Sequence, residues 1–501
     1  MIGLFAFGAA HVLHARDIRV ANRAALTAAL VSAGAGDVVI LAKGKWHDVE
    51  LKITQGGAEG RPLVIRAEVP GETILGGTSR LEINAPYVTV DGLFFYKGAI
   101  AKGSVVAFNS HHGIVSNTAI VDYNPVDFAT EYYWVYFSGD YNLIDRCYFK
   151  GKNNAHPLIG NAIEDSRHNG VVNSYFKNIP YHAANGRENI RVWGTGKFDT
   201  PADDGAYFTI QGNLFDKADG EGTEIVSLKS NHNKLIGNTV LGTRGCLNIR
   251  RGDYNLVQGN IILGAGVVGA QGLRMSGSHN TVTGNYVSGC EFGIRVSAGE
   301  YVAKALTADF APSIKDGAKG KTDLTGIVPT YPQVTHLQLR NNTLVGNTGA
   351  DLEMGFLYKR KWPASQLVLM PEHCVIEGNR FVRPKGGDSI IGSVPDTEAP
   401  FNQFKPGPNR YAGNVLVGGK NAFAPAGGGY TSEPLPGAWS EVKERAAFKP
   451  LTAADVGPAW VIAFRKAGIF AMENDPSCYR TPAHTASALQ EKAHKKKKSH
   501  D

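Results

Sequence analysis

One short pattern recurs along this chain and decides its fold. It reads YFTIQGNLF at residues 207–215, HNKLIGNTV at 232–240, YNLVQGNII at 254–262 and HNTVTGNYV at 279–287. Each copy has a short apolar strand, a turn of Gly and Asn, and a second apolar strand, and the asparagines are 25, 22 and 25 residues apart. A period of this length, built from short strands, is typical of one turn of a parallel β-helix. Propeller blades need longer repeats, and leucine-rich repeats need a leucine ladder that this chain lacks.

Related copies extend the pattern toward both ends of the chain. They lie near Val90, Asn117, Cys147 and Asn173 on the N-terminal side, and at Asn342, Asn379 and Asn414 on the C-terminal side. The interval between Asn285 and Asn342 is 57 residues, so one rung there is replaced or extended by an excursion near residues 303–330. We interpret the repeated asparagine as structural: its side chain is buried at a sharp turn and hydrogen-bonds its counterpart on the next rung.

A helix is predicted before the first rung. Residues 21–33 (ANRAALTAALVSA) have helical apolar spacing, Asn22 is available as an N-cap, and Gly34 and Gly36 end the helix. Such a helix covers the open end of the stack, whose first rung otherwise exposes unpaired backbone groups. The sequence therefore predicts an all-β fold, a single-stranded right-handed parallel β-helix with an N-terminal capping helix.

The chain divides into four parts on this interpretation. Residues 1–16 are apolar and resemble a remnant of a secretory signal without a basic start, and residues 17–420 form the β-helix. Residues 421–484 are rich in Pro and Gly and are expected to pack irregularly, and residues 485–501 form a disordered Lys-rich tail. The five cysteines are scattered without metal-ligand spacing, so no disulfide framework is expected.

Composition limits the class of protein. Hydrophobic residues make up 43% of the 501 residues and charged residues 19%, which provides a long core and excludes low-complexity disorder for the main body. No uninterrupted apolar segment reaches membrane-spanning length. The formal net charge of +7 is compatible with a polyanionic partner, although the Lys-rich tail contributes +3 of it.

A column of basic residues is predicted on one outer face. Outward residues one period apart lie side by side at about 4.8 Å in a β-helix, which suits a long polymer. The motifs EIVSLKS, LNIRRGD and LRMSGSHN place on successive rungs Lys229, then Arg250 and Arg251, then Arg274, with the carboxylates of Glu221 and Glu224 at the edge of the column. A bulge at the RRGD turn would exchange Arg250 and Arg251, so alternation alone does not decide which of them shares the face of Lys229. From spacing alone, the column is equally well explained as ordinary solvent-facing charge.

These three motifs, on asparagine-turn rungs behind a capping helix, resemble polysaccharide lyase family six, the β-helical alginate lyases and chondroitinase B. The resemblance covers the chain from about residue 17 to about residue 414. It implies that Lys229 is the Brønsted base and Arg250 the acid of an elimination reaction. It also implies a calcium ion held by Asn189 and by two glutamates just before the base.

Glu224 matches one of these glutamates, and the other departs from the family pattern. The family has two glutamates separated by one residue, whereas this chain reads GEGTE, with Gly222 where the first would fall. Glu221 takes that place through a one-residue bulge, or the site holds its metal with fewer carboxylates or not at all.

The chemistry of a uronate polymer gives these roles a physical reason. Removal of the weakly acidic C5 proton requires that the adjacent carboxylate be neutralised, which calcium, a hard cation with oxygen ligands, would do. A lysine base must be neutral, and nearby cations lower its pKa from about 10.4. Arg250 stabilises or protonates the leaving oxygen, directly or through water, and Arg251 and Arg274 are candidate clamps for carboxylates of neighbouring sugars.

We therefore expect a monomeric polysaccharide lyase, secreted or periplasmic, with no nucleic-acid or membrane partner. Its anionic polysaccharide substrate is expected to be alginate rather than dermatan or chondroitin sulfate, while block preference and endo or exo cleavage are not fixed by periodicity. One alternative is a β-helical glycoside hydrolase, which needs facing carboxylates; the one adjacent acidic pair of the repeat region, Asp203 and Asp204, sits in a predicted turn. A second alternative is a β-helix that binds a polysaccharide without cleaving it.

Overall fold

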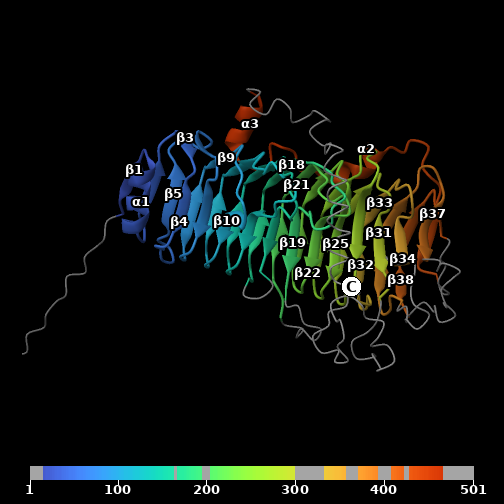
Figure 1. Cartoon of the computed structure of the whole chain (residues 1–501). Coiled ribbons are helices and arrows are strands. Elements are labelled where there is room, and N and C mark those ends of the chain that lie inside the picture. Colours follow the sequence, from blue (N-terminus) through green and yellow to red (C-terminus); the bar gives the residue numbers. More distant parts are fainter. Residues whose placement is uncertain are drawn as a thin grey trace, which may run out of the picture.

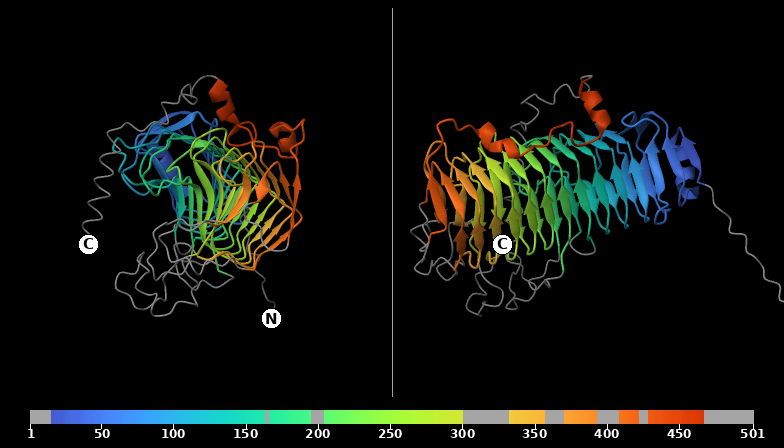
Figure 2. Two further views of the ribbon diagram at one scale, coloured as in Figure 1. Left: turned by 90° about the vertical axis from the view of Figure 1, so that its right-hand side faces the viewer. Right: turned by 180° about the vertical axis from the view of Figure 1, so that it is seen from behind.

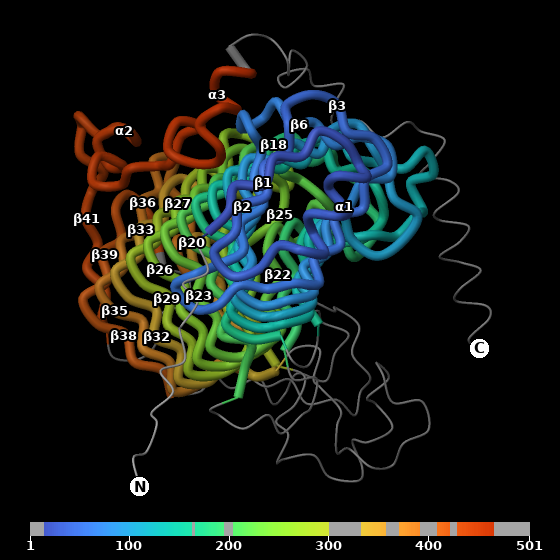
Figure 3. The backbone as a smooth tube through the Cα atoms, turned by 90° about the vertical axis from the view of Figure 1, so that its left-hand side faces the viewer, coloured from blue at the N-terminus to red at the C-terminus, as the bar shows by residue number. Residues whose placement is uncertain are grey.

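Three long parallel sheets wind around one core in the computed structural model, which describes residues 15–162, 166–194, 204–299, 332–356, 370–392, 408–421 and 428–466. The chain visits the sheets in a fixed order, sheet A, then sheet B, then sheet C, and each strand pairs with the strand one rung away. Figure 1 shows the resulting elongated stack, and Figure 3 looks along it. Because parallel crossovers wind right-handed, the fold is a right-handed parallel β-helix, as predicted.

The strands of the three sheets are short. Sheet A consists of β1 (Asp17–Val20), β2 (Val38–Leu41), β5 (Leu63–Ala67), β8 (Val88–Asp91), β11 (Ile114–Ser116), β14 (Leu143–Asp145), β17 (Gly170–Val172), β20 (Thr209–Gln211), β23 (Lys234–Ile236), β26 (Leu256–Gln258), β29 (Thr281–Thr283), β32 (Gln338–Arg340), β35 (Val375–Glu377) and β38 (Arg410–Ala412). Sheet B consists of β3 (Gly44–His47), β6 (Thr73–Gly76), β9 (Phe94–Tyr96), β12 (Ala119–Val121), β15 (Tyr148–Lys150), β18 (Tyr175–Ile179), β21 (Leu214–Ala218), β24 (Thr239–Leu241), β27 (Ile261–Leu263), β30 (Tyr286–Ser288), β33 (Thr343–Val345), β36 (Arg380–Val382), β39 (Asn414–Val417) and β41 (Tyr430–Glu433). Sheet C consists of β4 (Glu50–Ile53), β7 (Arg80–Ile83), β10 (Ser104–Phe108), β13 (Tyr133–Phe137), β16 (Ile159–Asn161), β19 (Ile190–Trp193), β22 (Glu224–Lys229), β25 (Gly245–Arg251), β28 (Ala270–Met275), β31 (Ile294–Ser297), β34 (Leu352–Phe356), β37 (Asp388–Gly392) and β40 (Lys420–Asn421).

Alternation along the strands divides core from surface. In β5, Leu63 and Ile65 are fully buried while Val64 and Arg66 are partly exposed. Successive residues of a strand point to opposite faces, so every second residue enters the core. Inside the three sheets, one hydrophobic cluster runs from Val20 on β1 to Leu416 on β39.

A ladder of buried asparagines fixes the turn between sheets A and B, as the sequence predicts. From Asn213 to Asn379, each side-chain amide donates to the next rung's side-chain oxygen at 2.9–3.0 Å, and each oxygen of the ladder also accepts a backbone N–H. The members are Asn213, Asn238, Asn260, Asn285, Asn342, Asn379 and Asn414. Every polar group of these buried side chains therefore finds a partner, which specifies the register of the stack.

Two of the predicted ladder positions are shifted by one residue. Asn117 and Asn173 occupy the left-handed turn position before the ladder, with φ of 50° at both. The ladder positions themselves are filled by Thr118 and Ser174, whose hydroxyls accept backbone N–H groups of the neighbouring rung. The correction follows from the tolerance of asparagine for left-handed backbone conformation, which makes it equally suited to the neighbouring position.

A second ladder lies outside, at the turns that precede the strands of sheet A from β8 to β35. Its tyrosine and histidine rings all have left-handed backbone conformation, with φ of 48–60°, and neighbouring ring centroids are 4.6–5.2 Å apart. The members are Tyr87, His112, Tyr141, His168, Tyr207, His232, Tyr254, His279, His336 and His373. Stacking of these rings compensates for the strain of the left-handed turn.

The N-terminal end is covered by a helix, as predicted. Helix α1 (Arg23–Ser32) begins after Asn22, whose side chain accepts the N–H of Ala25 at 2.9 Å, and it ends at Ala33. It buries Leu26, Ala29 and Leu30 against the first strands.

The C-terminal segment returns along the stack over the outer face of sheet B. It contains α2 (Glu441–Glu444), the 3-10 helix η3 (Arg445–Ala447) and α3 (Ala459–Lys466). Figures 1 and 2 show α2 over the C-terminal half of the stack and α3 over the N-terminal half, near β9. Phe448 packs on Tyr286, and Trp460 packs on Phe94 and donates its indole N–H to the carbonyl of Asn117.

Sheet pairing continues past residue 420, to Glu433 on β41. The excursion predicted near residues 303–330, residues 1–14 of the leader predicted at 1–16, and the predicted Lys-rich tail lie outside the described residues. Cys147, Cys246, Cys290 and Cys374 are buried and free, as predicted for core residues. Within the described part of the chain, no helix has the length and apolar character needed to cross a membrane.

Candidate active site

The basic column lies on the outer face of sheet C, at the middle of the stack. Four consecutive strands carry it, β19, β22, β25 and β28. Parallel pairing aligns Arg191 with Ser227, Asn248 and Arg274, one residue from each strand. The turns that precede β19 and β22 bring a group of acidic residues to the same place.

Lys229 ends β22 and is mostly enclosed, with 10% of its side chain exposed. Its Nζ lies 4.5 Å from the ring centroid of Trp193 and 3.5 Å from Glu188 Oε1. Burial lowers the pKa of Lys229; Glu188 and Glu224 oppose that shift, and Arg191 and Arg250 add to it. The lysine is therefore closer to its neutral form than a surface lysine, which favours a role as a base.

β25 contains the bulge at the RRGD motif that the sequence analysis left undecided. Leu228 pairs with Ile249, but Lys229 pairs with Arg251, so Arg250 is the extra residue on β25. The Arg251 guanidinium lies 5.2 Å from the ring centroid of Trp193, and the Arg250 Nη1 lies 3.5 Å from Glu224 Oε1. Trp193 thus has both Lys229 and Arg251 against its ring.

Arg274 differs from the expected solvent-facing clamp. Its side chain is 5% exposed, and its guanidinium is paired with Glu224 Oε1 at 2.5 Å and donates to Asn248 Oδ1 at 3.1 Å. Asn248 in turn donates to the same Glu224 oxygen at 2.8 Å. Arg274 therefore holds Glu224 in place. The strand register aligns Arg274 with Ser227 of β22, and its long side chain extends from there to Glu224 at the start of the same strand.

Glu224 is ion-paired rather than isolated. Although burial acts to raise its pKa, Arg274 and Arg250 outweigh burial and lower it. Glu221 lacks such partners: its Oε2 accepts the backbone N–H groups of Gly186 and Arg187 at 2.7 and 3.2 Å. Burial and the neighbouring carboxylates Glu188 and Glu224 raise the pKa of Glu221.

A third carboxylate, Glu188, completes the acidic group and is absent from the sequence-based set. Oxygens of Glu188, Glu221 and Glu224 all lie within 4.8 Å of one another, and all three residues are buried. Glu188 Oε2 has no hydrogen-bond partner, and neither has Oδ1 of the adjacent Asn189, whose Nδ2 donates to the carbonyl of Ala218. Three buried carboxylates thus converge, and the buried Asn189 directly follows one of them in the chain.

The acidic group has the dimensions of a calcium site. Oxygen ligands at about 2.3–2.6 Å from a cation lie up to about 5 Å from each other, which matches the observed spread. The donors are carboxylates and an amide, the ligand types that calcium prefers, and the two oxygens without hydrogen bonds are buried. The residues therefore fit this ion.

Trp193 and Arg191 are the other site residues that the sequence analysis missed. Both lie in RENIRVW, residues 187–193, the segment that contains Asn189, so the strand that follows this predicted calcium ligand was the available signal. Asn161 fixes the Trp193 backbone by accepting its N–H at 2.7 Å and donating to its carbonyl at 2.9 Å. Of the acidic pair considered for a hydrolase, Asp203 lies outside the described residues, and Asp204 lies before β20 and pairs with Arg167.

Comparisons with known proteins agree on one family. The family model named Chondroitinase B matches residues 20–297. A polysaccharide lyase of family six from Pseudopedobacter saltans is 38% identical, with 88% of this chain and 99% of that chain covered and a TM-score of 0.76. A comparison with curated proteins finds no match.

More distant solved structures share the fold. A mannuronic-acid-specific family six lyase from human gut microbiota is 23% identical over 92% of this chain and 100% of that chain, with a TM-score of 0.71. Alginate lyase AlyF-OU02 in complex with G6 is 19% identical over 89% and 95%, with a TM-score of 0.64. With the family model spanning more than half of the chain and a 38% identical relative spanning most of it, the chain belongs to polysaccharide lyase family six.

Proposed function

We propose that this polysaccharide lyase cleaves alginate by calcium-assisted β-elimination, with Lys229 as the base. The observation that carries the proposal is the position of Lys229 Nζ, enclosed against Trp193 and 3.5 Å from a carboxylate group sized for calcium. A base and a charge-neutralising site are the two components that elimination next to a carboxylate requires.

Lys229 takes the C5 proton of the uronate. The electron pair of the C5–H bond forms the C4–C5 double bond, the C4–O4 bond breaks, and its electrons go to O4, which becomes the hydroxyl of the departing chain. Arg250, one rung away and next to Glu224, is placed to stabilise the charge on O4 and to supply its proton directly or through water. Arg251 lies beside Lys229 and is the candidate clamp for a sugar carboxylate.

The acidic group serves the metal in this proposal. Asn189, Glu188, Glu221 and Glu224 would hold calcium, and the bound ion would supply charge neutralisation for the substrate carboxylate. Arg274 and Asn248, both buried, fix the Glu224 carboxylate. A competing explanation is that Glu224 only pairs with Arg250 and Arg274, and that these arginines perform the neutralisation.

Alginate is proposed as the substrate because the structural relatives named with a substrate act on alginate or mannuronic acid, although they share only the fold. Dermatan sulfate is the second candidate, since the matching family model is that of chondroitinase B. Both polymers contain uronates bonded at C4.

The experiment is incubation with mannuronate blocks, guluronate blocks and dermatan sulfate, with absorbance near the ultraviolet edge as the readout. Elimination creates an unsaturated product that absorbs there, while hydrolysis does not. We expect absorbance to rise with an alginate block and to be abolished in Lys229→Ala. A rise in absorbance with dermatan sulfate alone would identify dermatan sulfate, and not alginate, as the substrate. No rise with any polymer would contradict the proposed lyase reaction.

A further inference from the structure

A second polar surface continues from the candidate active site along sheet C toward the N-terminus. The register aligns Arg191 on β19 with Gly160 on β16, Tyr136 on β13, Ala107 on β10 and Glu82 on β7. These residues are one outward column, the same column that contains Ser227, Asn248 and Arg274 farther on. A polymer lying over Lys229 and following this column reaches β10 after four rungs, about 19 Å at about 4.8 Å per strand.

Two tyrosines form the middle of this surface. The rings of Tyr133 and Tyr136 are 4.7 Å apart, and the Tyr133 hydroxyl accepts a hydrogen bond from Arg191 at 3.2 Å. Gly160 makes room for Tyr133, because a Cβ there would lie 2.5 Å from the ring. The aromatic surface is therefore continuous with the guanidinium of Arg191, which borders the candidate active site.

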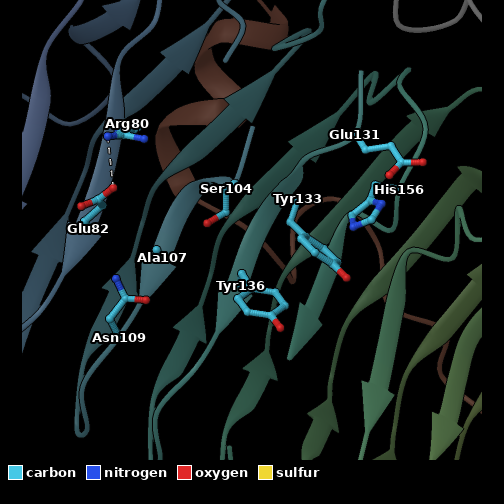
Figure 4. A pocket seen from close by; sticks show the side chains of 10 residues that line it. Arg80, Glu82, Ser104, Ala107, Asn109, Glu131, Tyr133, Tyr136 and His156 are labelled. Atoms are coloured by element: carbon cyan, nitrogen blue, oxygen red, sulfur yellow. Dashed lines mark ion pairs between the residues drawn. The ribbon is translucent and has the colours of Figure 1, made fainter. Parts of the chain in front are cut away.

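The two tyrosines line a cavity of about 480 Å³ that extends along the column to Arg80 and Glu82 (Figure 4). Ala107 lies between Glu82 and Tyr136 in the column, and its small side chain leaves the hollow. Asn109 lines the cavity and donates its amide to Asn84 at 2.8 Å. Figure 4 shows Tyr133 and Tyr136 between Ala107 on one side and His156 on the other.

The charges in this cavity differ from those around Lys229. Arg80 is paired with Glu50 and with Glu82, the latter at 3.4 Å, so its charge is compensated. Glu131 adds a further carboxylate at the rim. Burial lowers the pKa of His156 to about 4, which leaves the imidazole neutral near neutral pH. The cavity thus offers aromatic faces and hydrogen-bond acceptors with no excess of positive charge.

We propose that this cavity is a distal subsite for a sugar unit of the chain whose cleaved bond lies at Lys229, held by its ring face and hydroxyl groups rather than by its carboxylate. Sugar hydroxyls donate to carboxylate and amide oxygens, and the apolar face of a pyranose ring packs on tyrosine. The inference rests on the proposed function, and it adds that the enzyme favours substrates long enough to extend over β10.

The test compares oligosaccharides of the preferred alginate block in two lengths, one just long enough to be cleaved and one several units longer. Ala107→Phe fills the cavity, and Tyr136→Ala removes one aromatic face without adding bulk. Thr89→Phe, an outward position of β8 on sheet A, is the matched control for an added ring. Circular dichroism and the unfolding temperature show that each variant is folded.

We expect the ratio of kcat/KM for the long oligosaccharide to that for the short one to fall about tenfold in Ala107→Phe and Tyr136→Ala, since one stacked sugar contributes roughly that much. The ratio should stay at the wild-type value in Thr89→Phe. An unchanged ratio in folded Tyr136→Ala overturns the distal subsite, even if Ala107→Phe fails to fold.

Binding separates this inference from the proposed function. Calorimetry with Lys229→Ala should give higher affinity for the long oligosaccharide, and the gain should disappear when Ala107→Phe or Tyr136→Ala is added. This measurement needs no turnover, so a wild-type protein without lyase activity would contradict the function while the gain with length would still support the subsite. The gain in affinity with oligosaccharide length should also persist at high salt. A gain that vanishes at high salt would indicate that Arg80 binds a sugar carboxylate, which would overturn recognition by ring face and hydroxyl groups.

Discussion

Lys229 and Arg251 are paired across adjacent strands of sheet C, because the register slips by one residue after Leu228. The slip leaves Arg250 as the additional residue, directed to Glu224, while Arg251 shares the ring of Trp193 with Lys229. Two consecutive arginines thus occupy different surroundings, and this difference allows their roles to be separated by experiment.

Lys229→Ala should abolish elimination and leave the fold intact. Loss of a general base lowers turnover by about 10²–10⁴-fold, and the side chain makes no contribution to the core inside the sheets. Absorbance of the unsaturated product gives the rate, and circular dichroism reports the β-structure. Lys234→Ala, at an exposed position of β23, is the matched control and should retain wild-type activity. Retention of more than about a tenth of wild-type turnover by Lys229→Ala would remove Lys229 from the base role.

Arg250→Ala and Arg251→Ala should differ in the kinetic constant that they change. Arg250→Ala is expected to lower kcat severely, since Arg250 would act on the leaving oxygen, whereas Arg251→Ala should mainly raise KM. Steady-state kinetics on one alginate block measures both. The reverse pattern would assign the leaving-group role to Arg251.

Chelation should suppress turnover, and added Ca²⁺ should restore it. Calcium should also raise the unfolding temperature of the chelated protein, because a ligand that binds only the folded state stabilises it. Glu188→Gln and Glu221→Gln should weaken this thermal shift, which requires no substrate. The protein should be chelated until metal analysis finds no calcium. If it is still fully active, calcium is not required, and neutralisation of the substrate carboxylate is assigned to Arg250 and its neighbours.

Asn260→Ala should destabilise the stack. The substitution removes the acceptor for the backbone and side-chain N–H groups of Asn238 and leaves the carbonyl of Leu235 without its donor. Each buried polar group left without a partner costs about 1–3 kcal/mol, so a clear fall in the free energy of unfolding is expected. Gln258→Ala, an exposed amide on the same rung, should change the unfolding temperature little. Equal effects of the two substitutions would argue against the ladder as a source of stability.

The outer ring ladder should make stability depend on pH. Burial, followed by the neighbouring His279 and His373, lowers the pKa of His336, while Glu372 opposes the shift. A histidine with a lowered folded-state pKa contributes stability above its unfolded pKa of about 6.5 and loses it as pH falls below that value. The unfolding temperature should therefore decrease from about pH 7 to about pH 5.

His336→Tyr should weaken this pH dependence. Tyrosine occupies the equivalent turn position at Tyr207 and Tyr254, with φ of 48° and 57°, so the ring stack and the backbone can be kept. Thermal unfolding of both proteins across the pH range is the measurement. Identical slopes would exclude His336 as a contributor.

The fold was accessible from sequence because its two determinants are periodic. Strand alternation selects the buried residues, and the repeated asparagine meets its own counterpart one period later, so both can be read without knowledge of distant contacts. The same logic fails at Asn117 and Asn173, where the asparagine is favoured by the turn conformation instead of the ladder.

The site could be predicted only in part from the sequence, because its geometry depends on which turns face each other. Lys229 and the two arginines stand in recognisable motifs, but Glu188 joins Glu221 and Glu224 through the pairing of β19 with β22. Neither alternation nor spacing predicts that contact. The burial of Arg274 likewise follows from the reach of its side chain to Glu224, not from its position in the strand.

The segment at residues 434–466 changes how the stack can come apart. A stack of repeats in which each repeat contacts only its neighbours can unfold from either end, one repeat at a time. Here the ring of Phe448 packs on β30, the backbone N–H of Leu451 donates to the hydroxyl of Thr239 on β24, and the ring of Trp460 packs on β9. Because this segment follows the last strand, β41, it ties the C-terminal rungs to rungs far toward the N-terminus. Distant repeats are thereby joined into one cooperative unit, and fraying at the C-terminal end is opposed.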